Sequence, residues 1–264
     1  MESLDKFLEY RAQRLFETAF SRRADELPVD LVRLATAAGV LSIEERPMIP
    51  EAVLSTERAG FRIHLQNNFV GVPGVRIRQR FSLAHEIVHT FFYELHSGRY
   101  RAMPRAPRGD KLEAACHRGA GLILVPQRLL VGELGKFEKP IGATCAIELS
   151  RTFDVSVEVM LRRMRDACAS QLVDVALVLV RRIQQCEAVI DFALYPPWLK
   201  TLLPQPHRGR SFIPWLRHAV SDWKSGPDFV SVFETGLQKK TASGLLSVAP
   251  YKVTRSLQIF ELRL

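Results

Sequence analysis

The sequence has 264 residues, of which 47% are hydrophobic and 25% charged, and these values are typical of a globular chain rather than a disordered one. Its 37 Lys and Arg against 28 Asp and Glu give a formal net charge of +9, which favours an acidic partner or nucleic acid. The N-terminal segment is too charged for a signal peptide, and no apolar run approaches the roughly 20 residues of a membrane span. We therefore expect a cytoplasmic protein that makes no membrane contact.

The cysteines are scattered along the chain without the CxxC spacing of a zinc finger. Because no secretory signal accompanies them, they are expected to be reduced and mostly buried thiols. They are Cys116, Cys145, Cys168 and Cys186.

The first part of the chain predicts helices followed by a small sheet. Apolar residues recur at helical spacing up to about residue 40, and Gly39 is a candidate C-cap. Short runs typical of strands follow at Val40–Ile43 and Phe61–Leu65, separated by Pro and Gly.

From Arg80 an apolar stripe predicts a helix, and a second helix is predicted over Lys111–Leu124, ending before Pro126. The arginine-rich stretch between them, residues 97–110, holds two Pro and two Gly and is expected to be an irregular loop. Two helices should therefore flank a basic loop.

The remainder of the chain predicts two further parts. Residues 143–164 have the pattern of a helix, a short turn and a second helix, with Ser156 as the N-cap of the second. Strand-like runs follow at 174–183, 188–195 and 258–264. We expect an α+β chain with a first domain at 1–135, a helix-turn-helix-like segment at 136–168 and a C-terminal α+β domain at 169–264.

The strongest chemical signal is the H-E-x-x-H motif formed by His85, Glu86 and His89. On a helix the two histidines lie one turn apart and face the same way, as coordination of one tetrahedral zinc ion requires. Glu86 lies beside that face and is placed to act as general base toward a zinc-bound water. The alternative is that both are ordinary histidines of an amphipathic helix.

The third ligand has two candidates on the second helix, Glu113 and His117, which are one turn apart. Glu113 is preferred, because a His-His-Glu set leaves the fourth position of a catalytic zinc ion open for water. His117 suits a role in orienting a ligand. His96 is disfavoured, because Phe92 replaces the glycine of the metzincin pattern.

Two tyrosines and a group of arginines are weaker candidates. Tyr93 and Tyr100 are candidate donors of a hydrogen bond to the oxyanion of a hydrated peptide, although packing is the simpler interpretation of each. The arginines of the loop can attract an acidic substrate or merely solvate the loop.

Several segments, in the right order, resemble the ImmA/IrrE family of metallopeptidases. LPVDLVRLATAAGV is similar to the opening helix of the family, RFSLAHEIVHTFF to its R-F-T-L-A-H-E-L-G-H signature, and LEAACHRGAGLILVP to E-x-x-A-N-x-F-A-A-x-L-L-x-P. The resemblance covers about residues 27–126. It implies a zincin-like peptidase domain at 1–135. It also implies His85, His89 and Glu113 as ligands of one zinc ion and Glu86 as general base.

The chain departs from the third of these patterns at three positions. Cys116 and His117 stand where the family has Ala and Asn, and Gly119 stands where it has Phe. These changes preserve the implied ligands and alter their surroundings.

The resemblance further implies an intracellular bacterial endopeptidase that cleaves a helix-turn-helix repressor and so switches on stress or mobile-element genes. In longer members a helix-turn-helix-like segment and a GAF-like sensor domain follow the peptidase, and the C-terminal domain here is a candidate for such a sensory unit.

Two other functions stay open: a DNA-binding regulator with a structural or vestigial zinc site, in which Arg162 and Arg163 contact nucleic acid, and a component of a toxin–antitoxin pair.

Overall fold

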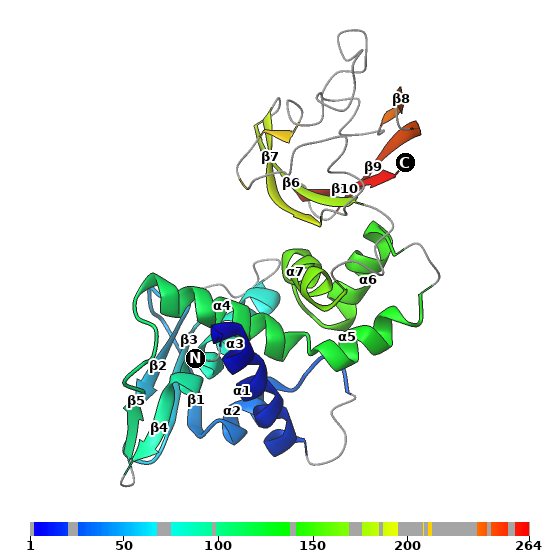
Figure 1. Cartoon of the computed structure of the whole chain (residues 1–264). Coiled ribbons are helices and arrows are strands. Elements are labelled where there is room, and N and C mark those ends of the chain that lie inside the picture. The colour runs from blue at the N-terminus through cyan, green and yellow to red at the C-terminus, as the bar shows by residue number, and fades with distance from the viewer. Residues whose placement is uncertain are drawn as a thin grey trace. The chain divides into compact units, whose positions relative to one another are not determined.

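The computed structural model describes residues 3–20, 26–67, 75–96, 99–137, 141–168, 176–184, 187–194, 208, 211–212, 237–241, 244–252 and 257–263. These residues form helices and small sheets, so the chain is of the predicted α+β class. Its contacts divide it into two compact units, residues 1–129 with 151–156 and residues 130–150 with 157–264 (Figure 1). Among the helices of the described part, none has the length and apolar character needed to cross a bilayer.

The first unit places a group of helices beside a three-stranded sheet. In chain order its elements are α1 (Leu4–Ala19), α2 (Leu31–Ala37), β1 (Val40–Arg46), β2 (Ala52–Thr56), β3 (Phe61–Gln66), α3 (Val75–His89), the 3-10 helix η1 (Thr90–Phe92), β4 (Tyr93–His96), β5 (Arg99–Ala102) and α4 (Asp110–Leu124). The strand order is β1-β3-β2, with β1 parallel and β2 antiparallel to β3, and β4 pairs with β5 in a separate hairpin.

Local signals explain where the first elements begin and end. The Asp30 carboxylate accepts hydrogen bonds from the N–H groups of Val32 and Arg33 at 2.9 and 3.1 Å and so caps the N-terminus of α2. Gly39 follows the end of α2 with a φ of +85°, a conformation that glycine adopts without strain, and the chain then enters β1. The C-cap residue itself is Ala38, so Gly39 lies one position beyond the predicted cap.

Helix α3 packs against β2, β3 and α4, and its buried residues Ala84, Ile87 and Val88 are completely shielded from solvent. The approach of α4 to α3 depends on Gly119, because a Cβ atom at this position would lie only 2.5 Å from Cγ1 of Val88. A phenylalanine, the residue of the family pattern, has no room there. The substitution at position 119 is therefore tied to the close contact of the two helices.

Arg80 connects α3 to two other segments of the first unit. Its guanidinium donates hydrogen bonds to the carbonyl oxygens of Val29 and Asp154, at 3.1 and 3.3 Å, and lies 3.3 Å from the Asp154 carboxylate. Burial lowers the pKa of Arg80 from its usual value, while Asp154 favours the charged form. Arg76 also pairs with Asp154, at 2.9 Å, but its side chain is 77% exposed against 18% for Arg80.

The second unit is built on a five-stranded antiparallel sheet. Its elements are α5 (Gln127–Leu134), α6 (Ala143–Thr152), α7 (Val157–Cys168), β6 (Ala176–Gln184), β7 (Glu187–Leu194), β8 (Leu237–Thr241), β9 (Gly244–Lys252) and β10 (Leu257–Arg263), with α5 and α6 extending across the division. The strand order is β7-β6-β10-β9-β8. The buried Glu261 of β10 accepts a hydrogen bond of 2.7 Å from the N–H of Ala143, the first residue of α6.

The structure corrects two expectations about the first unit. The basic stretch at 97–110 is not wholly irregular, because Arg99–Ala102 forms β5 and pairs with β4. Strand β2 was not foreseen, because its five residues carry no regular alternation of buried and exposed positions.

In the second unit, α6 and α7 confirm the predicted helix, turn and helix, and Ser156 directly precedes α7. Strands β6, β7 and β10 coincide with the strand-like runs, and β8 and β9 add two that were not foreseen. The predicted strand ends at Asp174, Tyr195 and Leu264 lie outside the described residues.

Gly119→Ala should destabilise the protein by about 1–2 kcal/mol, because overpacking against the stiff Val88 side chain exceeds the roughly 1 kcal/mol gained in helix propensity. Gly132→Ala is the matched control: Gly132 is also helical, and a Cβ atom there meets nothing within 4 Å, so this variant should gain about 0.5–1 kcal/mol. Urea unfolding measures both changes. Equal effects of the two substitutions would contradict the proposed contact.

Arg80→Ala should cost about 2–3 kcal/mol in the free energy of unfolding, because it removes two hydrogen bonds and leaves the half-buried Asp154 with one exposed partner. Arg76→Ala removes an exposed partner of the same carboxylate and should cost less than about 1 kcal/mol. Thermal unfolding of the two variants provides the comparison, and a larger loss for Arg76→Ala would refute this ranking.

Candidate metal centre

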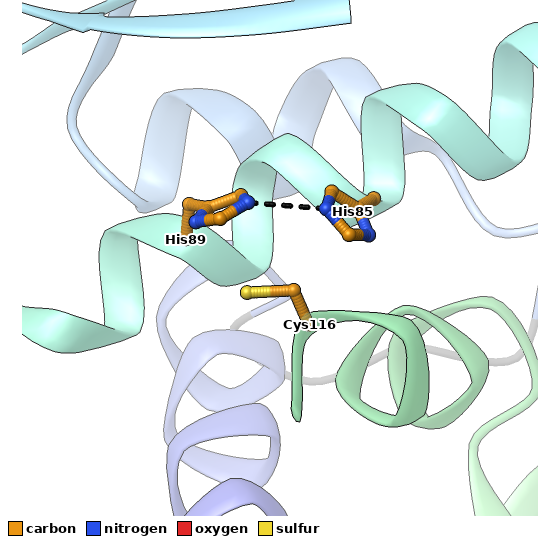
Figure 2. Close-up of side chains that lie close together, drawn as sticks. All are labelled: His85, His89 and Cys116. Atoms are coloured by element: carbon orange, nitrogen blue, oxygen red, sulfur yellow. Dashed lines mark hydrogen bonds between the residues drawn. The ribbon is translucent and has the colours of Figure 1, made fainter. Parts of the chain in front are cut away.

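The two histidines of the H-E-x-x-H motif lie at the end of α3 with their rings turned toward each other (Figure 2). The Nε2 atoms of His85 and His89 are 3.1 Å apart, and the ring centroids are 4.8 Å apart. His85 is 8% exposed, so its ring is held by the surrounding protein. The predicted orientation of both side chains toward one point is therefore present in the structure.

Glu113 of α4 brings a carboxylate to the same point. Its Oε2 atom lies 3.1 Å from Nε2 of His85, and its Oε1 atom lies 3.7 Å from Nε2 of His89. The Glu113 side chain is 54% exposed, so it approaches the histidines from the solvent side. The residue chosen from the sequence as third ligand is thus next to both histidines.

These distances and donor types fit a metal ion. In a tetrahedral zinc site with bonds of about 2.1 Å, neighbouring ligand atoms lie roughly 3.4 Å apart. The three separations among His85, His89 and Glu113 are 3.1, 3.1 and 3.7 Å. Two imidazoles and one carboxylate also form a common donor set of catalytic zinc, with room for a fourth ligand.

The surroundings keep both imidazoles neutral. Burial lowers the pKa of His85 to about 4; His89 and His117 also lower it, and Glu113 acts in the opposite direction. Burial also lowers the pKa of His89. At neutral pH the contact between His85 and Glu113 is therefore a hydrogen bond of a neutral ring rather than an ion pair. Neutral imidazole is the form that binds a metal.

Glu86 is buried beside the histidines, with 8% of its surface exposed. Burial raises the pKa of its carboxyl to about 7, which the backbone N–H of Leu54 in β2 opposes and the negative charge of Glu113 reinforces. A carboxyl group with a pKa near neutrality can both accept and return a proton at physiological pH.

His117 lies one turn after Glu113 on α4. Its Nδ1 atom is 2.8 Å from the backbone carbonyl oxygen of Glu113, and its ring stands edge-on to that of His85 with centroids 4.7 Å apart. His117 therefore packs against the ring of the proposed ligand His85 and contacts the backbone of the proposed ligand Glu113. Its role in orienting them stays a prediction.

Tyr93 and Tyr100 lie on the β4–β5 hairpin and pack on Phe61 of β3, with ring centroids 5.3 and 4.4 Å away. The hydroxyl of Tyr100 also lies close to Gly39, 2.9 Å from the position of an added Cβ atom. These contacts give each tyrosine a packing role. A role as hydrogen-bond donor to a substrate remains a prediction.

Cys116 joins this group, although the sequence interpretation treated it only as a buried thiol. It is fully buried, and its Sγ atom and one ring nitrogen each of His85 and His89 all lie within 4.8 Å of one another. Burial strongly raises the pKa of the thiol, and the carboxylates of Glu113 and Glu86 add to this effect. Cys116 follows Glu113 by three residues, and this spacing is the sequence signal that could have predicted that the two side chains share one face of the helix.

A second cluster overlaps the first. One ligand atom each of His85, Glu113 and His117 also lie within 4.8 Å of one another. His117 is exposed, so this cluster lies toward solvent.

Comparison with family models identifies residues 74–165 as an IrrE N-terminal-like domain of the M78 peptidases. The matched segment contains the whole candidate metal centre, from His85 to His117. The match agrees with the resemblance to the ImmA/IrrE family that the sequence motifs carry, and it covers about a third of the chain.

A comparison with curated proteins gave no match. Among solved structures, the chain is similar to a Mycobacterium tuberculosis transcriptional regulator at 13% identity, with a TM-score of 0.46, over 98% of this chain and 77% of that one.

Removal of any one of His85, His89 or Glu113 should weaken metal binding at least about 100-fold, because each supplies one of three converging donor atoms. His96→Ala is the matched histidine control, since His96 is exposed in β4, and it should bind as the wild type does. Titration with zinc against a competing chelator gives the affinities. Unchanged affinity in Glu113→Ala would remove Glu113 from the site.

Proposed function

We propose that the chain is a zinc-dependent endopeptidase, with one zinc ion per chain, that cleaves a regulatory protein at a specific site. The observation that supports this function most directly is the convergence of His85, His89 and Glu113 at ligand spacing, with a buried Glu86 beside them. Assignment of this segment to a peptidase family agrees with that chemistry.

When bound, the zinc ion would activate a water molecule by lowering its pKa and would polarise the scissile carbonyl. His85, His89 and Glu113 would hold the ion. Glu86, whose pKa of about 7 places it near half ionisation at neutral pH, would take the proton from the attacking water and deliver it to the leaving amine. Burial of Glu86 and His85 keeps bulk water from competing for that proton.

The substrate we propose is a helix-turn-helix transcriptional repressor, whose cleavage would switch on stress or mobile-element genes in the bacterial cytoplasm. This proposal follows from the ImmA/IrrE family. The net charge of +9 agrees with a protein that approaches a repressor bound to DNA. Within this scheme we propose a peptidase domain at 1–135, a helical segment at 136–168 and a GAF-like or sensory domain at 169–264.

Direct DNA binding through α7 is less well supported. Arg162 forms hydrogen bonds of 2.8 and 3.2 Å with Glu158 and lies over the ring of Phe192 in β7. Arg163 is 5% exposed, and the apolar residues Met160, Leu161 and Met164 are buried. A recognition helix needs free side chains on a face that fits the major groove, and these side chains are engaged inside the second unit.

Glu86→Gln should retain zinc and lower the rate of repressor cleavage by about 100- to 10,000-fold, which is the usual contribution of a general base. The assay is co-expression with candidate helix-turn-helix repressors, followed by mass spectrometry of the fragments. Glu9→Gln, at an exposed position of α1, is the matched control and should cleave normally.

Two results would contradict the proposed function. Cleavage by Glu86→Gln at the wild-type rate would remove Glu86 from the reaction. Loss of zinc in that variant would mean that Glu86 is a metal ligand and not the general base.

A further inference from the structure

Cys116 is placed beside the proposed metal ligands by the same helix that carries Glu113. Figure 2 shows its side chain reaching from α4 toward the rings of His85 and His89. Because Glu113 and Cys116 are three residues apart on α4, both side chains emerge from one helix face. The sulfur therefore forms a group of potential ligands with His85 and His89 rather than being an isolated buried thiol.

The two donors of α4 approach the histidines from different sides. The Glu113 side chain is 54% exposed and lies toward solvent, whereas Cys116 is 0% exposed and lies toward the interior. They do not compete for one position around an ion. Two imidazoles, one carboxylate and one thiolate together make the four ligands of a closed tetrahedral zinc site.

The distances are compatible with such a site after a small movement. For bonds of about 2.3 Å to sulfur and 2.1 Å to nitrogen, the sulfur and nitrogen atoms of a tetrahedral site lie roughly 3.6 Å apart. The Sγ atom of Cys116 and the ring nitrogens of His85 and His89 are all within 4.8 Å of one another. A displacement of roughly an ångström or less brings the sulfur to bonding distance.

We infer that Cys116 is a fourth protein ligand of the metal ion and that the resting site is closed by its sulfur. This inference rests on metal binding as proposed above, and not on peptidase activity. On ligation the S–H bond of Cys116 breaks, its proton passes to water, and a sulfur lone pair forms the bond to the ion, with no transfer of electrons. The sulfur then fills the position left for water, so cleavage requires that water displace it.

Position 116 also separates this chain from the family pattern. The pattern has alanine there, which offers no ligand atom, whereas this chain has cysteine. A closed resting site would therefore be a property of this chain and not of the pattern as a whole. It would make the peptidase latent until the sulfur is displaced.

The experiment uses the full chain, freed of metal and loaded with Co²⁺ in the absence of oxygen. We expect about one cobalt ion per chain and a thiolate-to-cobalt charge-transfer absorption in the near ultraviolet, which imidazole and carboxylate ligands do not produce. Cys116→Ala should still bind cobalt and lose this absorption. Cys145→Ala is the matched control, since Cys145 is also buried, and it should keep the absorption.

Each outcome decides between the two proposals. Cobalt bound by the wild type without the charge-transfer absorption overturns ligation by Cys116 and leaves the proposed function standing. The absorption together with no cleavage of any repressor by the wild type or by Cys116→Ala supports ligation and overturns the proposed function. If the wild type binds no cobalt, both fail. Persistence of the absorption in Cys116→Ala assigns it to another cysteine and overturns the inference.

The proposed latency of the peptidase is tested by a separate measurement. With saturating zinc, Cys116→Ala should cleave the co-expressed repressor several-fold faster than the wild type, because water no longer competes with sulfur. Cys145→Ala should cleave at the wild-type rate. A rate for Cys116→Ala equal to or below that of the wild type would contradict the closed resting site.

Discussion

The close packing of α3 on α4 is the constraint on which the candidate site depends. The absence of a side chain at Gly119 lets Val88 of α3 approach the backbone of α4, as the 2.5 Å separation of an added Cβ atom from Val88 demonstrates. The same packing of α3 on α4 brings Glu113 and Cys116 beside the histidines of α3. Glu113, Cys116 and His117 lie within six residues of Gly119 on the same helix. The contact between Gly119 and Val88 is therefore linked to the position of the proposed ligands on α4.

Burial produces two opposite effects in this site, and both are compatible with the proposed metal-dependent hydrolysis. It lowers the pKa of His85 to about 4, which leaves the imidazole neutral and able to bind a metal. It raises the pKa of Glu86 to about 7, which allows proton exchange at neutral pH. Both shifts arise because a low-dielectric surrounding disfavours whichever form is charged. The same apolar surroundings therefore suit Glu86 to the proposed role of base and His85 to the proposed role of ligand.

Two arginines, Arg80 and Arg162, serve contacts within their own units. Arg80 ties α3 to Val29 and Asp154, and Arg162 is engaged by Glu158 and Phe192. The net charge of +9 therefore does not translate directly into a surface for nucleic acid, since part of it is used for internal contacts.

The sequence alone determined the helical register of His85, Glu86 and His89, the choice of Glu113, and the helix-turn-helix pattern of α6 and α7, because these depend on spacing within one helix or between neighbouring helices. The structure alone decided what depends on distant segments. It brought the N–H of Leu54 to Glu86, paired β5 with β4, and placed the sulfur of Cys116 among the ligands. Periodicity predicts which face a residue occupies, but only tertiary packing determines what that face meets.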